Sequence, residues 1–305
     1  VTLPENICYF QNPAEGAIKD HFGKSVHNIL GSLQACSRQG LAERFDSTIG
    51  AGTILMPFGG RCQRTAEEGM AALIPVPEGE TPATTLMTYG FDPWLSSWSP
   101  FHGAYYAVTT ALARIAAMGG NPRQARLTLQ EYFERLTTEE KWGKPLAALL
   151  GAHQAQLDYK VPAIGGKDSM SGSFDDLHVP PTLVAFAVNV TSAEKVRSAT
   201  LPRAGLTLLR LSPQRNAFEL PEPDAFLAGL DLINRDDIAP SILAAGVVQG
   251  SGTAVAAIRM CFGEYLGLDI DDEWTTTELF QPDHGALILA AEDPAVIAAL
   301  EAGGA

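Results

Sequence analysis

One short segment of the chain gathers residue types that could bind a phosphate. In VPAIGGKDSMSGS (161–173), an apolar stretch runs into a turn of glycine and polar residues, namely Gly165, Gly166, Lys167, Asp168, Ser169 and Ser171. Glycines let backbone N–H groups approach an anion closely, a lysine adds positive charge, and hydroxyls add hydrogen-bond donors. The segment therefore has the chemistry of a phosphate-binding loop.

The spacing in this segment does not match a Walker A loop. That motif requires a glycine five residues before Gly166, where Val161 stands, and a Ser or Thr directly after the lysine, where Asp168 stands. Judged by spacing alone, a tight turn with solvated polar side chains explains the segment better than a phosphate site does.

A few residues elsewhere are weaker candidates for a site. Glu67 and Glu68 could bind magnesium, but adjacent residues of an extended segment point to opposite faces, so one at most would serve. We expect both carboxylates to be solvated. His102 either lines a cleft or has a structural role at a helix start, and the second reading is favoured. Trp94 and Trp98 stand near prolines and predict packing within a loop rather than a platform for bases.

The composition argues against several classes of partner. The chain has 305 residues, with 21 basic and 35 acidic ones and a formal charge of −14, which disfavours nucleic acid and anionic lipid. We find no apolar run of membrane-spanning length and no signal-peptide pattern at the start. The four cysteines form no CxxC pair, which argues against zinc and for reduced thiols. A cytoplasmic location is expected.

The elements that must position the loop can be predicted from hydrophobic patterns. Short apolar runs predict strands at 53–58, 71–76, 83–89, 125–129, 161–166 and 181–190, the last buried on both faces. Apolar stripes predict helices at 104–118, ended by Gly119 to Pro122, and at 142–157, with Pro145 in the first turn. Thr191 and Glu194 have the spacing of a capping box, which predicts a helix start there.

A second alternation of strands and helices follows residues 197–205. Strands are predicted at 206–211, 242–248 and 285–291, and helices at 224–233, from Ser251 to Leu266, and from Asp293 onward. We therefore expect an α+β fold with a linker or the tail of a preceding segment at 1–40, one unit at 41–198 and another at 199–305.

Four runs of sequence carry a resemblance to a known family. They are RFDSTIGAGTILMPFGG (44–60), LTLQEYFERL (127–136), WGKPLAALLGA (142–152) and PAIGGKDSMSGSF (162–174). Together they resemble the second synthetase half of large phosphoribosylformylglycinamidine synthases (PurL), within the superfamily of aminoimidazole ribonucleotide synthetase (PurM). The resemblance implies an N-terminal unit that pairs its sheet with that of a partner domain, and a C-terminal unit that flanks it.

The resemblance also implies roles for the loop residues. Gly165 and Gly166 would lie beside the phosphates of ATP, Lys167 near phosphate or its Mg²⁺, and Ser169 against formylglycinamide ribonucleotide. Asp168 and Ser171 belong to the same loop. Asp46, Ser47 and Thr48 match another family segment, although turn formation alone would also explain them. The implied reaction is ATP-dependent amidation of formylglycinamide ribonucleotide with ammonia from glutamine, a step of purine biosynthesis.

The sequence departs from the family pattern at several positions. The His-Asp-x-Ser-Asp-Gly-Gly segment is missing, and Thr110 and Arg114 replace an acidic residue and an amide that would serve a nucleotide's magnesium. Since a hard cation requires oxygen ligands, we expect the auxiliary nucleotide site of some relatives to be degenerate here.

Residues needed for the complete reaction are also missing from the chain. No cysteine stands in a G-x-C-x-G context, and the glycine-rich ATP loop and catalytic histidine of a first synthetase half are absent. We therefore expect a component that works with a first half and a glutaminase domain, is inactive alone, and forms a homodimer when isolated. Two alternatives stay open: a non-catalytic scaffold that pairs sheets, and a small-molecule kinase of the same superfamily, which the missing ATP loop disfavours.

Overall fold

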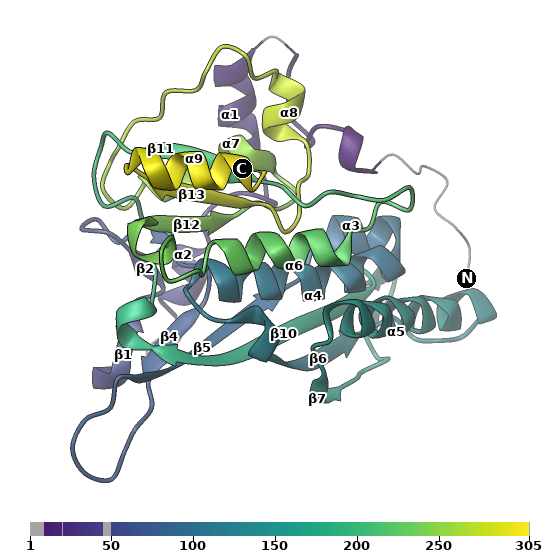
Figure 1. Cartoon of the computed structure of the whole chain (residues 1–305). Coiled ribbons are helices and arrows are strands. Elements are labelled where there is room, and N and C mark those ends of the chain that lie inside the picture. Colours follow the sequence, from purple (N-terminus) through teal and green to yellow (C-terminus); the bar gives the residue numbers. More distant parts are fainter. Residues whose placement is uncertain (1–8, 20, 45–49, 305) are drawn as a thin grey trace.

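A six-stranded sheet forms the base of the molecule. The computed structural model describes residues 9–19, 21–44 and 50–304 (Figure 1). In spatial order the strands are β1 (Thr53–Leu55), β4 (Met70–Leu73), β5 (Ala83–Gly90), β10 (Thr182–Ser192), β6 (Arg126–Tyr132) and β7 (Ala163–Lys167). All neighbours are antiparallel except β6 and β7, which are parallel. The predicted strands of the first unit are thus confirmed, with shifted ends.

Two long helices cover one face of this sheet. Helix α4 (Pro100–Ala117) begins at Ser99, whose hydroxyl accepts from the His102 N–H, and is followed by Gly119 at φ +86°. Helix α5 (Glu139–Tyr159) begins at Thr138, whose hydroxyl accepts from Lys141 N–H. Because this cap lies earlier than expected, Pro145 stands inside α5, and its predicted place in the first turn was wrong.

The other face of the sheet is open. Strand β10 alternates between residues buried under α4, such as Ala185 and Ala187, and half-buried residues such as Phe186, while Val190 is exposed. The prediction that this strand is buried on both faces was therefore wrong, because the helices cover one side only. Exposed apolar side chains also stand on neighbouring strands, at Met87 and Tyr89 of β5 and at Tyr132 of β6. We call this side of the sheet the open face.

The predicted helix start at Thr191 was also wrong. Strand β10 continues to Ser192, which pairs with Ala83, and a single 3-10 turn at Ala193–Lys195 follows. The Glu194 carboxylate accepts from the Ser192 hydroxyl instead of closing a capping box on Thr191. Pairing along the whole of β5 therefore outweighs the local helix signal.

A smaller three-stranded antiparallel sheet lies above α4. Its order is β11 (Thr207–Leu211), β13 (Leu287–Ala291) and β12 (Ala244–Val247). Helices α6 (Pro223–Leu232), α7 (Gly252–Cys261), α8 (Thr276–Phe280) and α9 (Pro294–Ala302) accompany it. Helix α7 ends before Leu266, which was predicted to lie in it. Figure 1 shows α6 over α4, so the layers run from large sheet through helices to small sheet. The α+β fold class is confirmed.

One hydrophobic core joins these layers. It includes Leu112 and Ile115 of α4 together with Phe226 of α6, Leu287 of β13 and Leu300 of α9. Apolar burial of this kind contributes roughly 25 cal/mol per Å² of surface removed from water. The predicted boundary at residue 198 separates the two sheets, but side chains from both sides of it share this core.

The segment before the large sheet also has structure. Helices α1 (Phe22–Leu30) and α2 (Gln39–Ala42) precede it, and Ile29 packs in one cluster with Val255 of α7 and Phe280 of α8. Neither helix was predicted, although Phe22, Val26, Ile29 and Leu30 of α1 have the i, i+4, i+7, i+8 spacing of an apolar helix face. The remaining elements are α3 (Pro93–Trp98), β2 (Phe58–Gly59), β3 (Thr65–Ala66), β8 (Ser173–Phe174) and β9 (Leu177–His178). None of the helices in the described ranges has the length and apolar character needed to cross a bilayer.

Candidate functional site

The loop singled out in the sequence begins on an edge strand. Strand β7 lies parallel to β6, with Gly165 opposite Thr128 and Lys167 opposite Gln130. A Cβ at Gly166 would stand 2.7 Å from the Leu129 carbonyl oxygen, so only glycine allows this close pairing. A Cβ at Gly165 would meet nothing within 4 Å. Gly166 therefore has a structural role, whereas Gly165 leaves open space beside the backbone.

The residues after β7 are held by backbone hydrogen bonds. The Ser169 N–H donates to the Glu131 carbonyl at 3.0 Å, and the Phe133 N–H donates to the Ser169 carbonyl at 2.9 Å. The Ser169 and Ser171 hydroxyls are 3.1 Å apart. The exposed Lys167 ammonium lies 4.8 Å from the centre of the Tyr132 ring, without an ion pair to any described residue. The segment thus carries an exposed cation and two neighbouring hydroxyls.

Glu131 is a residue of this region that sequence reasoning missed. It is 6% exposed, and its Oε1 atom has no hydrogen-bond partner among the described residues. Burial, with a further contribution from the Asp168 charge, raises the pKa of Glu131 to about 7. A signal was present: in LTLQEY, Glu131 is in phase with the buried Leu127. Since alternate residues of a strand share one side, a carboxyl group at position 131 must be buried on the same side as Leu127 or must distort the strand.

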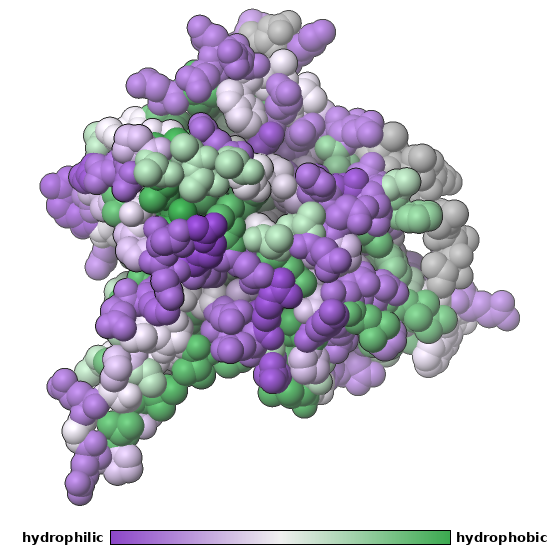
Figure 2. All heavy atoms as spheres, viewed as in Figure 1, coloured by the Kyte–Doolittle hydropathy of each residue, from purple (hydrophilic) through white to green (hydrophobic). Residues whose placement is uncertain are grey.

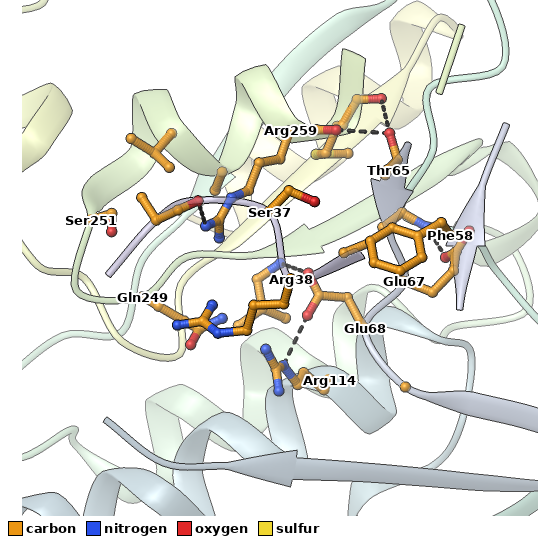
Figure 3. A pocket seen from close by; sticks show the side chains of 18 of the residues that line it. Ser37, Arg38, Phe58, Thr65, Glu67, Glu68, Arg114, Gln249, Ser251 and Arg259 are labelled. Atoms are coloured by element: carbon orange, nitrogen blue, oxygen red, sulfur yellow. Dashed lines mark hydrogen bonds and ion pairs between the residues drawn. The ribbon is translucent and has the colours of Figure 1, made fainter. Parts of the chain in front are cut away.

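A second candidate site is a cavity of about 690 Å³. Figure 3 shows Arg38, Arg114 and Arg259 around it, together with Glu68 and Gln249. Arg38 follows α1, and Glu68 lies between β3 and β4. Arg114 belongs to α4, Gln249 to the turn after β12, and Arg259 to α7. The cavity therefore lies where the N-terminal segment and the two sheet-bearing units meet. We call it the arginine pocket.

Arg114 and Glu68 form a buried ion pair in the wall of this pocket. Arg114 Nε is 2.9 Å from a Glu68 oxygen, and Arg114 Nη1 donates to the Tyr89 carbonyl at 2.7 Å. The other Glu68 oxygen accepts from the Val247 N–H at 2.8 Å. The Arg114 charge, against the effect of burial, lowers the pKa of the Tyr89 hydroxyl. This pair links α4 to β12.

Glu67 is also engaged within the protein. Its carboxylate accepts from the Ser198 hydroxyl at 2.6 Å, the Ala199 N–H at 2.8 Å and the Thr200 hydroxyl at 3.4 Å. Burial raises the pKa of Glu67 in spite of these donors. The expectation that both glutamates are solvated was wrong, because the chain folds back over them from residues 198–200 and 247.

These residues do not fit a magnesium ion. The Arg114 guanidinium stands beside Glu68, where a cation would have to bind, and Thr110 is buried in α4. No group of three or more His, Cys, Asp or Glu residues among the described positions could hold a metal ion. A guanidinium in contact with the carboxylate gives the charge balance that a metal would otherwise provide.

The remaining candidates have structural roles or lie elsewhere. His102 Nδ1 is 2.8 Å from the Ser99 hydroxyl and Nε2 is 2.9 Å from the Phe218 carbonyl, and burial lowers the pKa of the ring. The structural reading of His102 is confirmed. Trp94 and Trp98 lie in helix α3 and not in a loop, because Asp92 caps that helix and Pro93 begins it. Asp46–Thr48 lie outside the described residues.

Comparisons with known proteins connect the chain to PurL. No family model matches the sequence. The chain is 23% identical over 259 residues to the phosphoribosylformylglycinamidine synthase subunit PurL of Thermoplasma volcanium, covering 80% of the chain and 34% of that protein. It is 24% identical over 286 residues to PurL of Rhodopseudomonas palustris, covering 92% of the chain and 34% of that protein. The chain thus spans about a third of these relatives.

Solved structures of PurL share the fold. PurL from T. maritima complexed with AMPPCP superposes with a TM-score of 0.60 at 15% identity, covering 86% of the chain and 40% of that protein. The same protein complexed with FGAR gives a TM-score of 0.59 at 14% identity, covering 85% and 37%. Sequence and fold agree with the resemblance carried by the four sequence runs. The chain is therefore PurL-like in its sequence and in its fold.

Proposed function

We propose that this chain is the second half of the synthetase core of a phosphoribosylformylglycinamidine synthase. In this role it supplies the 165–169 loop to the site where ATP drives the amidation of formylglycinamide ribonucleotide. The observation that carries the proposal is the loop itself, which has the exposed Lys167 and, two and four residues later, the Ser169 and Ser171 hydroxyls 3.1 Å apart. The PurL structures complexed with ATP and with FGAR support the choice of ligands.

The loop residues fit the demands of phosphoryl transfer. Catalysis of that step depends mainly on positioning and on neutralising charge that develops on the phosphate oxygens. Lys167 would neutralise part of that charge, and the open space beside Gly165 would let backbone groups approach the phosphates. Ser169, held by two backbone hydrogen bonds, would orient the ribonucleotide. Ammonia from glutamine would come from a glutaminase domain outside this chain.

The open face supports the proposed pairing with a partner sheet. Met87, Tyr89, Tyr132 and Val190 expose apolar side chains on it. Figure 2 shows apolar side chains reaching the lower rim of the molecule, where Figure 1 places the large sheet. A contiguous apolar sheet face is a common interaction surface. We propose that the sheet of a first synthetase half covers this face, and that a second copy of the chain does so when the chain is isolated.

A scaffold role is the second candidate. The buried pair of Arg114 and Glu68 favours it for the arginine pocket, because these residues leave no place for a nucleotide's magnesium. The Lys167 loop favours a catalytic contribution at its own site. The two roles concern different parts of the chain and are tested separately.

Replacing Lys167 tests the catalytic proposal. In the complete enzyme, Lys167→Ala should lower turnover about a hundredfold, because loss of one charge that stabilises a transition state costs on the order of 3 kcal/mol. Lys24→Ala, on the exposed surface of α1, is the matched control and should keep native turnover. Steady-state rates with saturating ATP compare the turnover of both variants with that of the native enzyme. Near-native turnover of Lys167→Ala would show that the loop has only a structural role.

A further inference from the structure

The arginine pocket has the size of a small-molecule site. Its volume of about 690 Å³ lies within the range of ligand pockets, which is roughly 300–1,000 Å³. Aromatic side chains at Phe58, Tyr89 and Trp94 contribute to its lining. It is therefore large enough for a ligand with an apolar or ring portion as well as a charged group.

Its charges are unbalanced in a way that favours an anion. Four arginines among the described lining residues, at positions 38, 64, 114 and 259, face three carboxylates, at positions 67, 68 and 92. All three carboxylates have partners: Glu68 pairs with Arg114, Glu67 accepts three hydrogen bonds, and Asp92 accepts from two N–H groups at the start of α3. Four guanidinium groups against three carboxylates leave one positive charge over, in a chain whose formal charge is −14.

Besides Arg114, the pocket is lined by Arg38, Arg64 and Arg259. None of them forms an ion pair with a carboxylate in the described part of the chain. Arg259 donates to the Ala35 carbonyl, and Arg38 donates to the Leu33 carbonyl at 3.0 Å. These carbonyls place the guanidinium groups without neutralising them. Burial lowers the pKa of Arg259, and Arg38 and Arg114 lower it further against the opposing effect of Glu68.

The N-terminus of helix α7 contributes the positive end of a helix dipole to the pocket. Residues Gln249–Gly252 line the pocket, and Gly252 adopts φ +84°, which brings its backbone close to Leu279 and Phe280. The Ser251 side chain makes no capping hydrogen bond to α7. The positive end of a helix stabilises a nearby anion. Figure 3 shows Gln249 and Arg38 on the same side of the cavity.

We infer that the arginine pocket binds a phosphorylated small molecule without a divalent cation. The inference rests on the volume of the cavity, on Arg38 and Arg259 in its lining, and on the ion pair between Arg114 and Glu68. Arg38 and Arg259 contact the phosphate, since guanidinium groups bind phosphate oxygens in a two-pronged geometry. The aromatic side chains pack against the rest of the ligand. Arg114 keeps Glu68 neutralised, so a metal ion has no carboxylate to bind. This site is separate from the 165–169 loop and does not depend on its proposed function.

Calorimetric titration of the full chain tests the inference. The probes are inorganic pyrophosphate and ribose 5-phosphate, each titrated in the presence of EDTA and again with excess Mg²⁺. Saturable binding is expected in EDTA, and Mg²⁺ should not tighten it. Arg38→Gln and Arg259→Gln should each weaken binding at least tenfold. Arg61→Gln, an exposed arginine outside the pocket, is the matched control and should bind as the native chain does.

Lys167→Ala distinguishes this site from the loop. It should keep the EDTA-insensitive binding that Arg38→Gln loses. The inference is overturned if neither probe binds, if binding requires Mg²⁺, or if Lys167→Ala abolishes binding while Arg38→Gln leaves it intact. The last result would instead support the proposed function of the loop. Arg38 is exposed, so Arg38→Gln decides the question even if the more buried Arg259→Gln does not fold.

Discussion

At the scale of single residues, sequence reasoning located the loop but missed what surrounds it. Glycine, lysine and serine at 165–171 could be recognised because their types and spacing suit an anion. The engagement of Glu67 depends on Ser198 and Ala199, more than a hundred residues away. No local pattern contains such a contact. The burial of Glu131 could have been predicted from the alternation of residues along β6, because it lies on the same side of the strand as the buried Leu127.

Glu131 gives the stability of the protein a pH dependence. Its pKa is raised from 4.5 to about 7 in the folded chain, so the folded state holds a proton between these values that the unfolded state releases. Its contribution to stability is therefore fully present below about pH 4.5, is lost as the pH rises to about 7, and stays lost above.

Glu131→Gln should remove this loss. We expect the free energy of unfolding of the variant to exceed that of the native chain by about 2 kcal/mol at pH 8, with a much smaller difference at pH 5. Urea denaturation at both pH values measures it. Glu140→Gln, on the exposed first turn of α5, should give the same difference at both pH values. A difference for Glu131→Gln that does not change with pH would contradict the assignment.

At the scale of elements, the strongly periodic segments were predictable and the short ones were not. Helix α4 was identified because its apolar stripe is long and Gly119 and Pro122 follow it. Helix α3 has only 6 residues, although Asp92 followed by Pro93 was a usable start signal. The helix expected at Thr191 failed because β10 finds hydrogen-bond partners on β5 up to its last residue. Long-range pairing is invisible to a local pattern.

The ion pair between α4 and the neighbouring segments can be tested by a double-mutant cycle. Arg114→Met should lower the free energy of unfolding by about 3–5 kcal/mol, because it leaves the Glu68 charge buried without its partner. Adding Glu68→Gln should restore a large part of that loss, since a neutral amide still accepts from the Val247 N–H. Chemical denaturation of the two single variants and the double variant gives the coupling. Strict additivity of the two effects would mean that the pair contributes nothing.

At the scale of the whole molecule, the open face is the feature that the sequence anticipated only in part. The resemblance implied that the sheet of the N-terminal unit pairs with a partner sheet, and in the structure β5, β6 and β10 carry the exposed apolar side chains. Which side of the sheet would be open was not predictable, because it depends on where α4 and α5 pack.

We expect the isolated chain to be a homodimer that buries the open face about a two-fold axis. Met87→Glu should shift it toward the monomer, because a charge in an apolar interface is costly to desolvate. Leu33→Glu, which changes an 82% exposed leucine on the N-terminal segment, should leave the dimer intact. Multi-angle light scattering distinguishes the two masses. A native chain that stays monomeric at high concentration would refute this interface.

The core shared across residue 198 has a consequence for how the protein can be divided. Leu112 and Ile115 beneath, and Phe226, Leu287 and Leu300 above, belong to one apolar cluster. Arg197 stands at the junction and donates to the carbonyls of Ala117 and Ile233, one from each side. Cutting the chain there would bare this cluster to water on both fragments. We therefore expect the two units to unfold together, in one cooperative transition.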